Sequence, residues 1–136
     1  MQNLTEGQLK RQVEDYLEFA QNQGKLVYLR LNAGDFIEVR GDTRRRIKGC
    51  QAGTADLMVI REIKLQLKKA TRKFINELGF ENVVTPEVIF LELKSAKGKQ
   101  SDAQKEFQVL VEAQGCSYFL IRSIEKVMEV MIDEKS

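Results

Sequence analysis

Histidine and tryptophan are absent from this 136-residue chain, which also contains a single proline and two cysteines. Without histidine, the chain can supply neither the base of a Ser-His-Asp hydrolase nor an imidazole ligand for zinc. The sequence also lacks a GxxxxGK[ST] phosphate-binding loop. Cys50 and Cys116 are too few for a disulfide framework, and we expect both to be buried thiols in a reducing, intracellular environment.

Long apolar runs are missing too, as is the hydrophobic core of a signal peptide, so we expect no membrane association and a cytoplasmic location. Hydrophobic residues make up 43% of the chain, which is enough to build a core within the usual size of one domain. Neither repeats nor a linker-like composition interrupts the sequence. We therefore expect residues 1–136 to form one domain.

The chain does contain an apolar run, Val88-Ile-Phe-Leu-Glu-Leu-Lys94, which predicts a buried strand interrupted by two charges. Side chains alternate along a strand, so Glu92 and Lys94 point to the same face, about 7 Å apart along the strand. A buried carboxylate is costly without a partner such as a cation. Lys94 could itself be that partner in a structural ion pair, and a metal ion is the other candidate.

A second carboxylate, Asp56, follows Gly53 and Thr54 and precedes the apolar run 57–60. Two carboxylates on neighbouring strands can bind a hard divalent cation such as Mg²⁺, which takes oxygen ligands and retains several waters. An ammonium beside such a pair can orient a water or offset the charge that develops in phosphodiester hydrolysis. Asp56 also has a structural alternative, because aspartate after Gly-Thr commonly caps a turn.

The order Asp56, then Glu92-Leu93-Lys94 as E-x-K, then Gln104 at the start of the next helix resembles the PD-(D/E)XK nuclease superfamily and, within it, the virus-type replication-repair nuclease (VRR-NUC) family. The resemblance implies a restriction-endonuclease-like core, which is an α/β fold with a central mixed β-sheet flanked by helices. It also implies that Asp56, Glu92 and the Leu93 backbone carbonyl bind Mg²⁺ or Mn²⁺, and that Lys94 is catalytic. Gln104 would lie near the scissile phosphate, although it also completes a Ser-x-x-Gln capping box.

In this family an acid on the first helix usually joins the site, and Glu14 is the best positional match. Glu6 is a weaker candidate, and position alone would make Glu14 an ordinary surface acid. The chain departs from the family pattern by lacking the proline before Asp56. A second departure is a helical insertion at about 61–86, with a helix expected over 62–78. This insertion would distort the site if it displaced the two acid-bearing strands.

Positive charge concentrates around these motifs, because residues 40–105 hold 15 Lys and Arg against 8 Asp and Glu, whereas the whole chain has a net charge of only +2. This distribution suits a phosphate backbone, whose affinity comes largely from contacts with cations. The alternative is a solvated charged loop. The candidate DNA-binding residues are Arg44, Arg45, Arg46 and Lys48 in a hairpin-like arm that begins at Arg40, with Lys97 and Lys99 after the E-x-K strand.

Local signals predict the order of the elements. A Thr-x-x-Gln capping box and an apolar stripe predict a helix over about 5–23. Residues 32–34, Asn-Ala-Gly, predict a hairpin between strands over 26–31 and 35–40, and the strand at Asp56 continues this meander. The remaining predicted elements are a helix opening at Ser101, a strand over 117–121 and a helix from Ser123.

Together these features predict a Mg²⁺- or Mn²⁺-dependent endonuclease that hydrolyses phosphodiester bonds in DNA, with branched DNA such as Holliday junctions as the expected substrate. Symmetric cutting of a four-way junction needs two active sites, so we expect a homodimer. One alternative is nicking of duplex, flap or RNA substrates, and another is a catalytically silent DNA-binding module that retains the fold. If the chain is viral, its expected compartment is the host cytoplasm.

Overall fold

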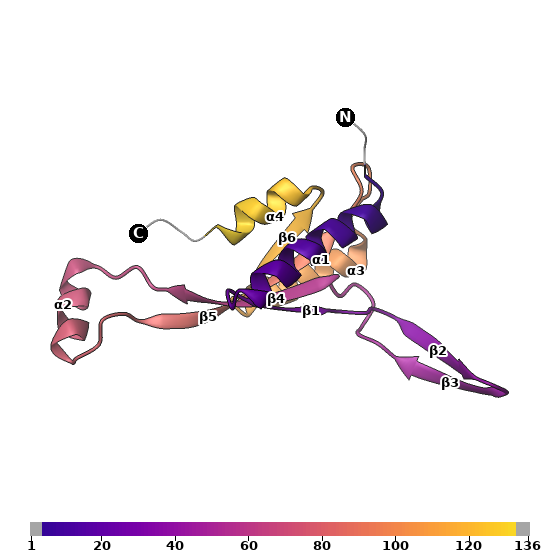
Figure 1. Ribbon diagram of the computed structural model, residues 1–136, viewed down its shortest axis with the longest axis horizontal. Helices are drawn as coiled ribbons and strands as arrows, with labels where there is room; N and C mark the ends of the chain where they lie inside the picture. The colour runs from indigo at the N-terminus through magenta and orange to yellow at the C-terminus, as the bar shows by residue number, and fades with distance from the viewer. Residues whose placement is uncertain (1–3, 133–136) are drawn as a thin grey trace.

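The structure, a computed structural model, describes residues 4–132. Four strands form a mixed sheet in the order β1-β4-β5-β6, in which only the β5–β6 pair is parallel. The chain is thus an α/β protein with a central mixed sheet flanked by helices, as predicted (Figure 1). The elements are α1 (Glu6–Asn22), β1 (Val27–Arg30), β2 (Asp35–Arg40), β3 (Thr43–Lys48), β4 (Leu57–Lys64), α2 (Lys69–Glu77), β5 (Val84–Leu93), α3 (Asp102–Ala113), β6 (Ser117–Ile121) and α4 (Ile124–Met131).

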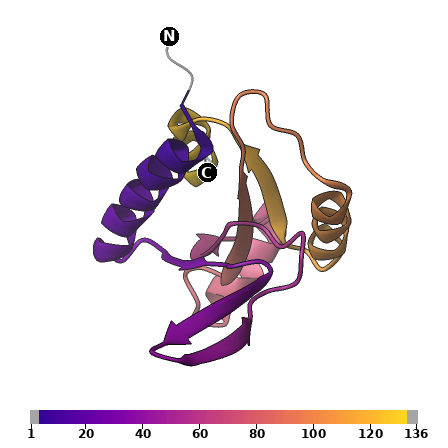
Figure 2. The ribbon, with the colours of Figure 1, turned by 90° about the vertical axis from the view of Figure 1, so that its right-hand side faces the viewer.

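Helices cover both faces of the sheet (Figure 2). On one face, α1 and α4 pack on the aliphatic side chains of β4 and β5, including Leu57, Leu91 and Leu93. On the other face, α3 packs through Phe107 on Phe90 and on the neighbouring strand β6. The alternation predicted for β5 is therefore confirmed, because its even-numbered residues face α3 and its odd-numbered residues face α1.

The central strands determine where the candidate carboxylates lie. β4 and β5 pair with Leu57 opposite Leu91, and one further step of the same antiparallel register would place Asp56 opposite Glu92. Residues that oppose each other in an antiparallel pair point to the same face. The pairing continues without interruption from Leu57 to Lys64, so the insertion after β4 does not separate the strands that carry the two acids.

The helix starts follow the capping signals in the sequence. Capping boxes at Thr5 and Ser101 begin α1 and α3, and the Ser123 side chain caps α4, so all three predicted starts are confirmed. Each cap satisfies backbone N–H groups that have no partner within the helix. Among residues 4–132, no helix is long and apolar enough to cross a membrane.

The predicted hairpin between strands 26–31 and 35–40 is wrong. β1 pairs with β4 instead, and β2 pairs with β3 around the turn at Gly41 and Asp42. The residues 32–34 form the root of this second hairpin, where Cys50 N donates to the Asn32 carbonyl and Gly34 N donates to the Cys50 carbonyl. Asn-Ala-Gly is a turn signal, but β1 joins the edge of the central sheet, where Tyr28 packs against the buried core, while β2 pairs with β3 outside that sheet.

The predicted helix over 62–78 is also wrong over residues 62–68. β4 continues to Lys64, and α2 begins only at Lys69. Extended β4 and β5 form a two-stranded projection that carries α2 at its far end (Figure 1). We call residues 62–86 the β4–β5 arm. Ile63 and Leu67 suit both a helical stripe and a strand followed by a turn, so the apolar spacing could not separate the two.

Candidate functional site

Glu92 is the one charged residue in the buried core of residues 4–132, with only 2% of its surface exposed. Its Oε1 atom accepts a hydrogen bond from Gln104 Nε2 at 2.8 Å. Its Oε2 atom is buried and has no hydrogen-bond partner within the described residues. A buried, unsatisfied carboxylate oxygen is costly, so its persistence points to a binding role that a ligand would complete.

Asp56 reaches the site from the loop that precedes β4. Its Oδ2 accepts a hydrogen bond of 2.7 Å from the backbone N–H of Leu93, which fixes the carboxylate beside the strand segment that carries Glu92. Gly53 makes this approach possible, because its φ is +91° and an added Cβ would lie 2.5 Å from the Ala103 carbonyl oxygen. The glycine therefore lets the loop pass directly against the start of α3.

Lys94 and Gln104 complete the polar cluster around Glu92. Lys94 Nζ lies 3.8 Å from Glu92 Oε1, at the outer limit of an ion pair and much closer than the separation along the strand predicts. Gln104 bonds in two directions, because its Oε1 accepts from Ser101 N at 2.8 Å while its Nε2 donates to Glu92. The capping role and the site role of Gln104 are thus compatible.

The electrostatics of the cluster favour the neutral form of Glu92. Burial and the nearby Asp56 carboxylate raise the pKa of Glu92 to about 8, and the Lys94 ammonium opposes this rise only in part. The charge of Lys94 therefore does not balance two carboxylates in this environment. A bound cation would offset the excess negative charge of the two carboxylates and so favour the ionised form of Glu92.

The two candidate acids of the first helix have different surroundings. The Glu14 carboxylate pairs with Arg30, and this pair lies on a surface hollow along α1. Glu6 is exposed at the start of α1, yet it is near enough to Glu92 to contribute to the raised pKa. The structure thus links Glu6 to Glu92 electrostatically, and the role of Glu14 or Glu6 at the site stays a prediction.

A divalent metal ion fits the chemistry of this donor set. No cluster of three or more acidic, histidine or cysteine side chains suited to a metal occurs in the part of the chain that the structure describes. Asp56 and Glu92 nevertheless offer two carboxylates, with the Leu93 carbonyl in the same strand segment. Mg²⁺ commonly binds through one or two carboxylates and keeps several waters, so two acids are sufficient.

Sequence reasoning missed Tyr118 and Gln100, which line the same region from β6 and from the loop before α3. Gln100 Nε2 lies 3.0 Å from the Tyr118 hydroxyl and 2.9 Å from Gln108 Oε1. Burial, aided by the charges of Glu92 and Asp56, raises the pKa of Tyr118 to about 12. The phenol therefore stays protonated and can donate a hydrogen bond. A lone tyrosine in an apolar strand gave no signal of this placement.

The β2–β3 hairpin carries the expected basic arm away from the sheet (Figure 1). Arg44, Arg46 and Lys48 alternate along β3 and so share one face, whereas Arg45 points to the other. Arg46 pairs with Asp35, and Arg45 pairs with Glu38 at 3.6 Å. Acidic partners thus offset part of the arm's charge, but Arg44 and Lys48 have none within residues 4–132.

Lys97 and Lys99 are exposed on the loop between β5 and α3, directly after the E-x-K segment. Arg122 holds this loop, because its guanidinium donates to the carbonyls of Ser95 at 2.6 Å and Gly98 at 2.7 Å. The two lysines are therefore presented next to Lys94 by an ordered backbone.

The structure brings together Asp56, Glu92, Lys94 and Gln104, and the basic residues Lys97 and Lys99 follow directly in the chain. Such an arrangement can bind a hard divalent cation and an anionic ligand side by side. Comparison with known proteins adds no assignment, since no family model, curated protein or solved structure matches this chain significantly.

Proposed function

We propose that this chain is a Mg²⁺- or Mn²⁺-dependent endonuclease that hydrolyses phosphodiester bonds in DNA. The observation that carries the proposal is the buried Glu92 carboxylate, whose Oε2 has no partner in the described chain and which lies beside Asp56. A core position would be more stable with an apolar residue, so the carboxylate indicates function. The fold that this proposal implies is the restriction-endonuclease-like core of the PD-(D/E)XK nucleases.

Each residue of the cluster then has a role. Asp56, Glu92 and the Leu93 carbonyl would hold the cation, with Glu6 at the edge of the site. When bound, the cation supplies Lewis-acid chemistry by polarising the phosphate and lowering the pKa of a water.

The other two side chains of the cluster, Gln104 and Lys94, would position the Glu92 carboxylate and supply positive charge. Gln104 holds the Glu92 carboxylate in place through its 2.8 Å hydrogen bond. Lys94 is close enough to the Glu92 carboxylate to orient the attacking water or to offset the negative charge of the transition state.

The basic segments support a nucleic acid as substrate. Arg44 and Lys48 on the β2–β3 hairpin, with Lys97 and Lys99 beside the E-x-K strand, place cations on both sides of the cluster along the chain. These cations, with Arg45 and Arg46, would bind phosphates flanking the scissile bond. Branched DNA, cut by a homodimer, is the substrate that the resemblance to VRR-NUC proteins favours.

Cleavage of labelled four-way-junction DNA and of matching linear duplex tests the proposal. Purified protein should cut in Mg²⁺ or Mn²⁺ but not in EDTA, and Glu92→Gln should abolish cutting while preserving the fold. Glu18→Gln, an exposed acid on α1, is the matched control and should cut normally. Preference for the junction over the duplex would assign the substrate.

Three other outcomes would change the proposal. Binding to DNA without cutting in every metal would favour a silent DNA-binding module. Faster cutting of a matched RNA would reassign the substrate class. Equal cutting by wild type and Glu92→Gln would remove Glu92 from the chemistry.

A further inference from the structure

The two faces of the β2–β3 hairpin differ in how their side chains are used. On one face the register places Phe36 opposite Ile47. Phe36 packs over the root of the hairpin, where a Cβ added to Gly49 would lie 2.8 Å from its ring. On the same face Glu38 pairs with Arg45 at 3.6 Å and offsets its charge. The side chains of this face therefore find partners within the hairpin itself.

The opposite face combines exposed aliphatic side chains with basic ones. Ile37 is 70% exposed and lies opposite Arg46, and Val39 is 60% exposed and lies opposite Arg44. Neither strand of the hairpin packs on another helix or strand of residues 4–132. We call this side of the hairpin the open face. Its side chains are those of Asp35, Ile37, Val39, Arg44, Arg46 and Lys48.

The composition of the open face favours a DNA groove as its partner. Phosphates can neutralise its cations, but they cannot cover two exposed aliphatic side chains. A DNA groove offers both contacts, because phosphates form its walls and base edges, including the methyl groups of thymine, form its floor. A second copy of the open face would instead be repelled by its like charge.

The root of the hairpin connects the open face to the candidate site. Gly49 N donates to the Gly34 carbonyl at 2.8 Å, which closes the root. Just before this root, Leu31 N donates to the Asp56 carbonyl at 2.8 Å. The hairpin therefore begins at a backbone segment that is bonded to the residue carrying a candidate metal ligand, and it projects from there away from the sheet (Figure 2).

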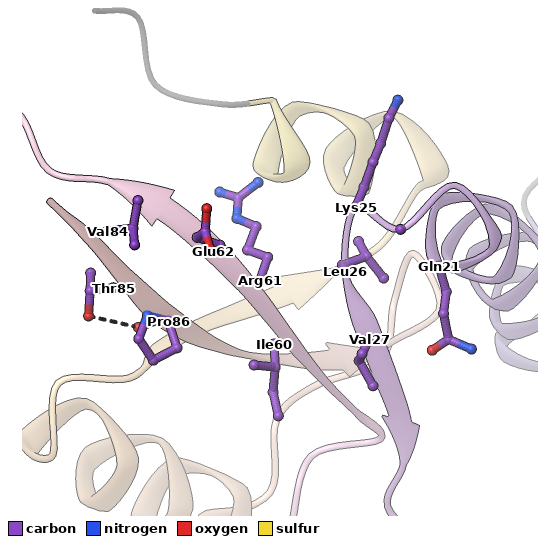
Figure 3. A pocket seen from close by; sticks show the side chains of 11 residues that line it. Gln21, Lys25, Leu26, Val27, Ile60, Arg61, Glu62, Val84, Thr85 and Pro86 are labelled. Carbon is purple, nitrogen blue, oxygen red and sulfur yellow. Dashed lines mark hydrogen bonds between the residues drawn. The ribbon is translucent and has the colours of Figure 1, made fainter. Parts of the chain in front are cut away.

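A hollow of about 480 Å³ at the other end of β1 offers no comparable site (Figure 3). Lys25 and Glu62 both line it, so its charges offset each other in part. Arg61 in the same lining donates to Glu87 at 2.9 Å and to the Met131 carbonyl at 2.8 Å. This arginine thus holds the end of α4 on the sheet, and the hollow gives no basis for a contact with phosphates.

We propose that the open face of the β2–β3 hairpin enters the major groove of duplex DNA, with Ile37 and Val39 against base edges and the basic residues against flanking phosphates. Each strand of the hairpin has six residues, which makes the ribbon about 20 Å long. A major groove about 12 Å wide admits a two-stranded ribbon, whereas a minor groove about 6 Å wide is too narrow for one. The inference rests on the proposed function and specifies a duplex arm beside the scissile bond as the part of the substrate that the hairpin holds.

Fluorescence anisotropy in EDTA measures binding to duplex DNA without cleavage. Ile37→Thr combined with Val39→Thr keeps β-branched side chains but makes them polar, and should weaken binding by about tenfold. The salt dependence should stay the same, because no cation is lost. Val27→Thr combined with Val84→Thr changes two other exposed valines, at 51% and 47%, and should bind like wild type.

Duplex DNA whose cytosines carry glucosylated hydroxymethyl groups tests the groove directly, because these neutral groups fill the major groove. Wild type should bind this DNA at least about tenfold more weakly than unmodified duplex. Netropsin, which occupies the minor groove, should not displace the protein. These measurements use wild type and do not depend on the folding of any variant.

The outcomes separate the groove contact from the nuclease. Binding that glucosylation does not weaken, or an Ile37→Thr/Val39→Thr protein that binds DNA like wild type, would overturn the groove contact even if the protein cuts DNA in Mg²⁺. Binding to phosphatidylglycerol vesicles that is lost in this variant, with DNA binding unchanged, would assign the open face to lipid and also overturn it. Failure of wild type to bind any DNA would overturn the groove contact and the proposed function together.

Discussion

At Glu92, one carboxylate oxygen is hydrogen bonded by Gln104 and the other has no partner within residues 4–132. The raised pKa gives this arrangement a measurable consequence in metal-free protein. Folded Glu92 keeps its proton up to a pH of about 8, whereas the unfolded residue loses it near 4.5. Between these values the folded state binds more protons, so the free energy of unfolding falls as the pH rises.

Glu92→Gln should abolish this pH dependence. In EDTA, wild type should lose up to about 1.4 kcal/mol of stability per pH unit between pH 5 and 8 relative to the variant. Urea denaturation at several pH values measures the difference. Mg²⁺ at a concentration that just saturates wild type should restore its stability at pH 8 and stabilise Glu92→Gln much less, because the variant keeps only the Asp56 carboxylate as an acidic ligand. Parallel pH profiles in the two proteins would contradict the assignment.

Replacing Lys94 should slow the cleavage of DNA without weakening its binding. Lys94→Ala should lower the cleavage rate at saturating DNA by about 100-fold or more, because its proposed contribution is to the transition state. The affinity for DNA should change little, as fluorescence anisotropy would show. Lys97→Ala provides the contrast, since it should weaken binding without slowing cleavage of bound DNA. Equal loss of binding and cleavage in Lys94→Ala would indicate a structural lysine.

At the scale of the elements, the loop before β4 and the start of α3 must touch for the site to form. Gly53→Ala would put a Cβ 2.5 Å from the Ala103 carbonyl oxygen and hold a left-handed φ. Gly79→Ala has nearly the same φ, +92°, but meets no atom within 4 Å. We expect Gly79→Ala to cost about 1 kcal/mol and Gly53→Ala clearly more.

The Gly53→Ala and Gly79→Ala proteins should also differ in their affinity for the metal. Gly53→Ala should also weaken metal binding, because the clash moves Asp56 away from Glu92, whereas Gly79→Ala should bind metal like wild type. Thermal denaturation with and without Mn²⁺ measures both effects. Similar losses of stability and metal affinity in the two variants would argue against the loop contact as the element that places Asp56.

We expect the basic residues of the β2–β3 hairpin to contribute to DNA binding. Replacing Arg44 and Lys48 together by alanine should weaken DNA binding and lower the slope of log affinity against log salt by about 2 for duplex DNA. Replacing Lys25 and Lys126 removes the same charge elsewhere and should leave the slope unchanged. An unaltered slope in the hairpin variant would take the hairpin out of the DNA interface.

Elements with local signals were predictable from the sequence, and elements set by distant partners were not. The capping residues Thr5 and Ser101 gave the starts of α1 and α3, because a cap depends on neighbours three residues away. The pairing of β1 with β4 was missed, because it joins segments about 30 residues apart and no turn marks it. In contrast, Gly41 and Asp42 lie in a turn that the sequence does show.

The same contrast applies to the site. Glu92 and Lys94 were predictable as neighbours on one face, because strand alternation is a local rule. Their 3.8 Å separation was not, since side-chain conformation depends on the surrounding packing. Glu14 was preferred over Glu6 as the best positional match to the family, and its pairing with Arg30 could not be predicted because it depends on where β1 lies. Tyr118 was missed for the same reason.

At the scale of the whole molecule, the candidate site and the β4–β5 arm use different parts of the sheet. The carboxylates lie where β4 begins and β5 ends, whereas α2 lies beyond the other ends of these strands. Phe74→Glu, a change on α2, should therefore leave metal binding intact.

The central claim is that the Asp56 and Glu92 carboxylates bind a divalent cation. The most direct test is a Mn²⁺ titration followed by electron paramagnetic resonance, with wild type and Glu92→Gln compared at pH 8. Our account predicts saturable binding to wild type, displacement by Mg²⁺, and binding at least about tenfold weaker in Glu92→Gln. Equal binding by both proteins, or no saturable binding by wild type, would contradict it.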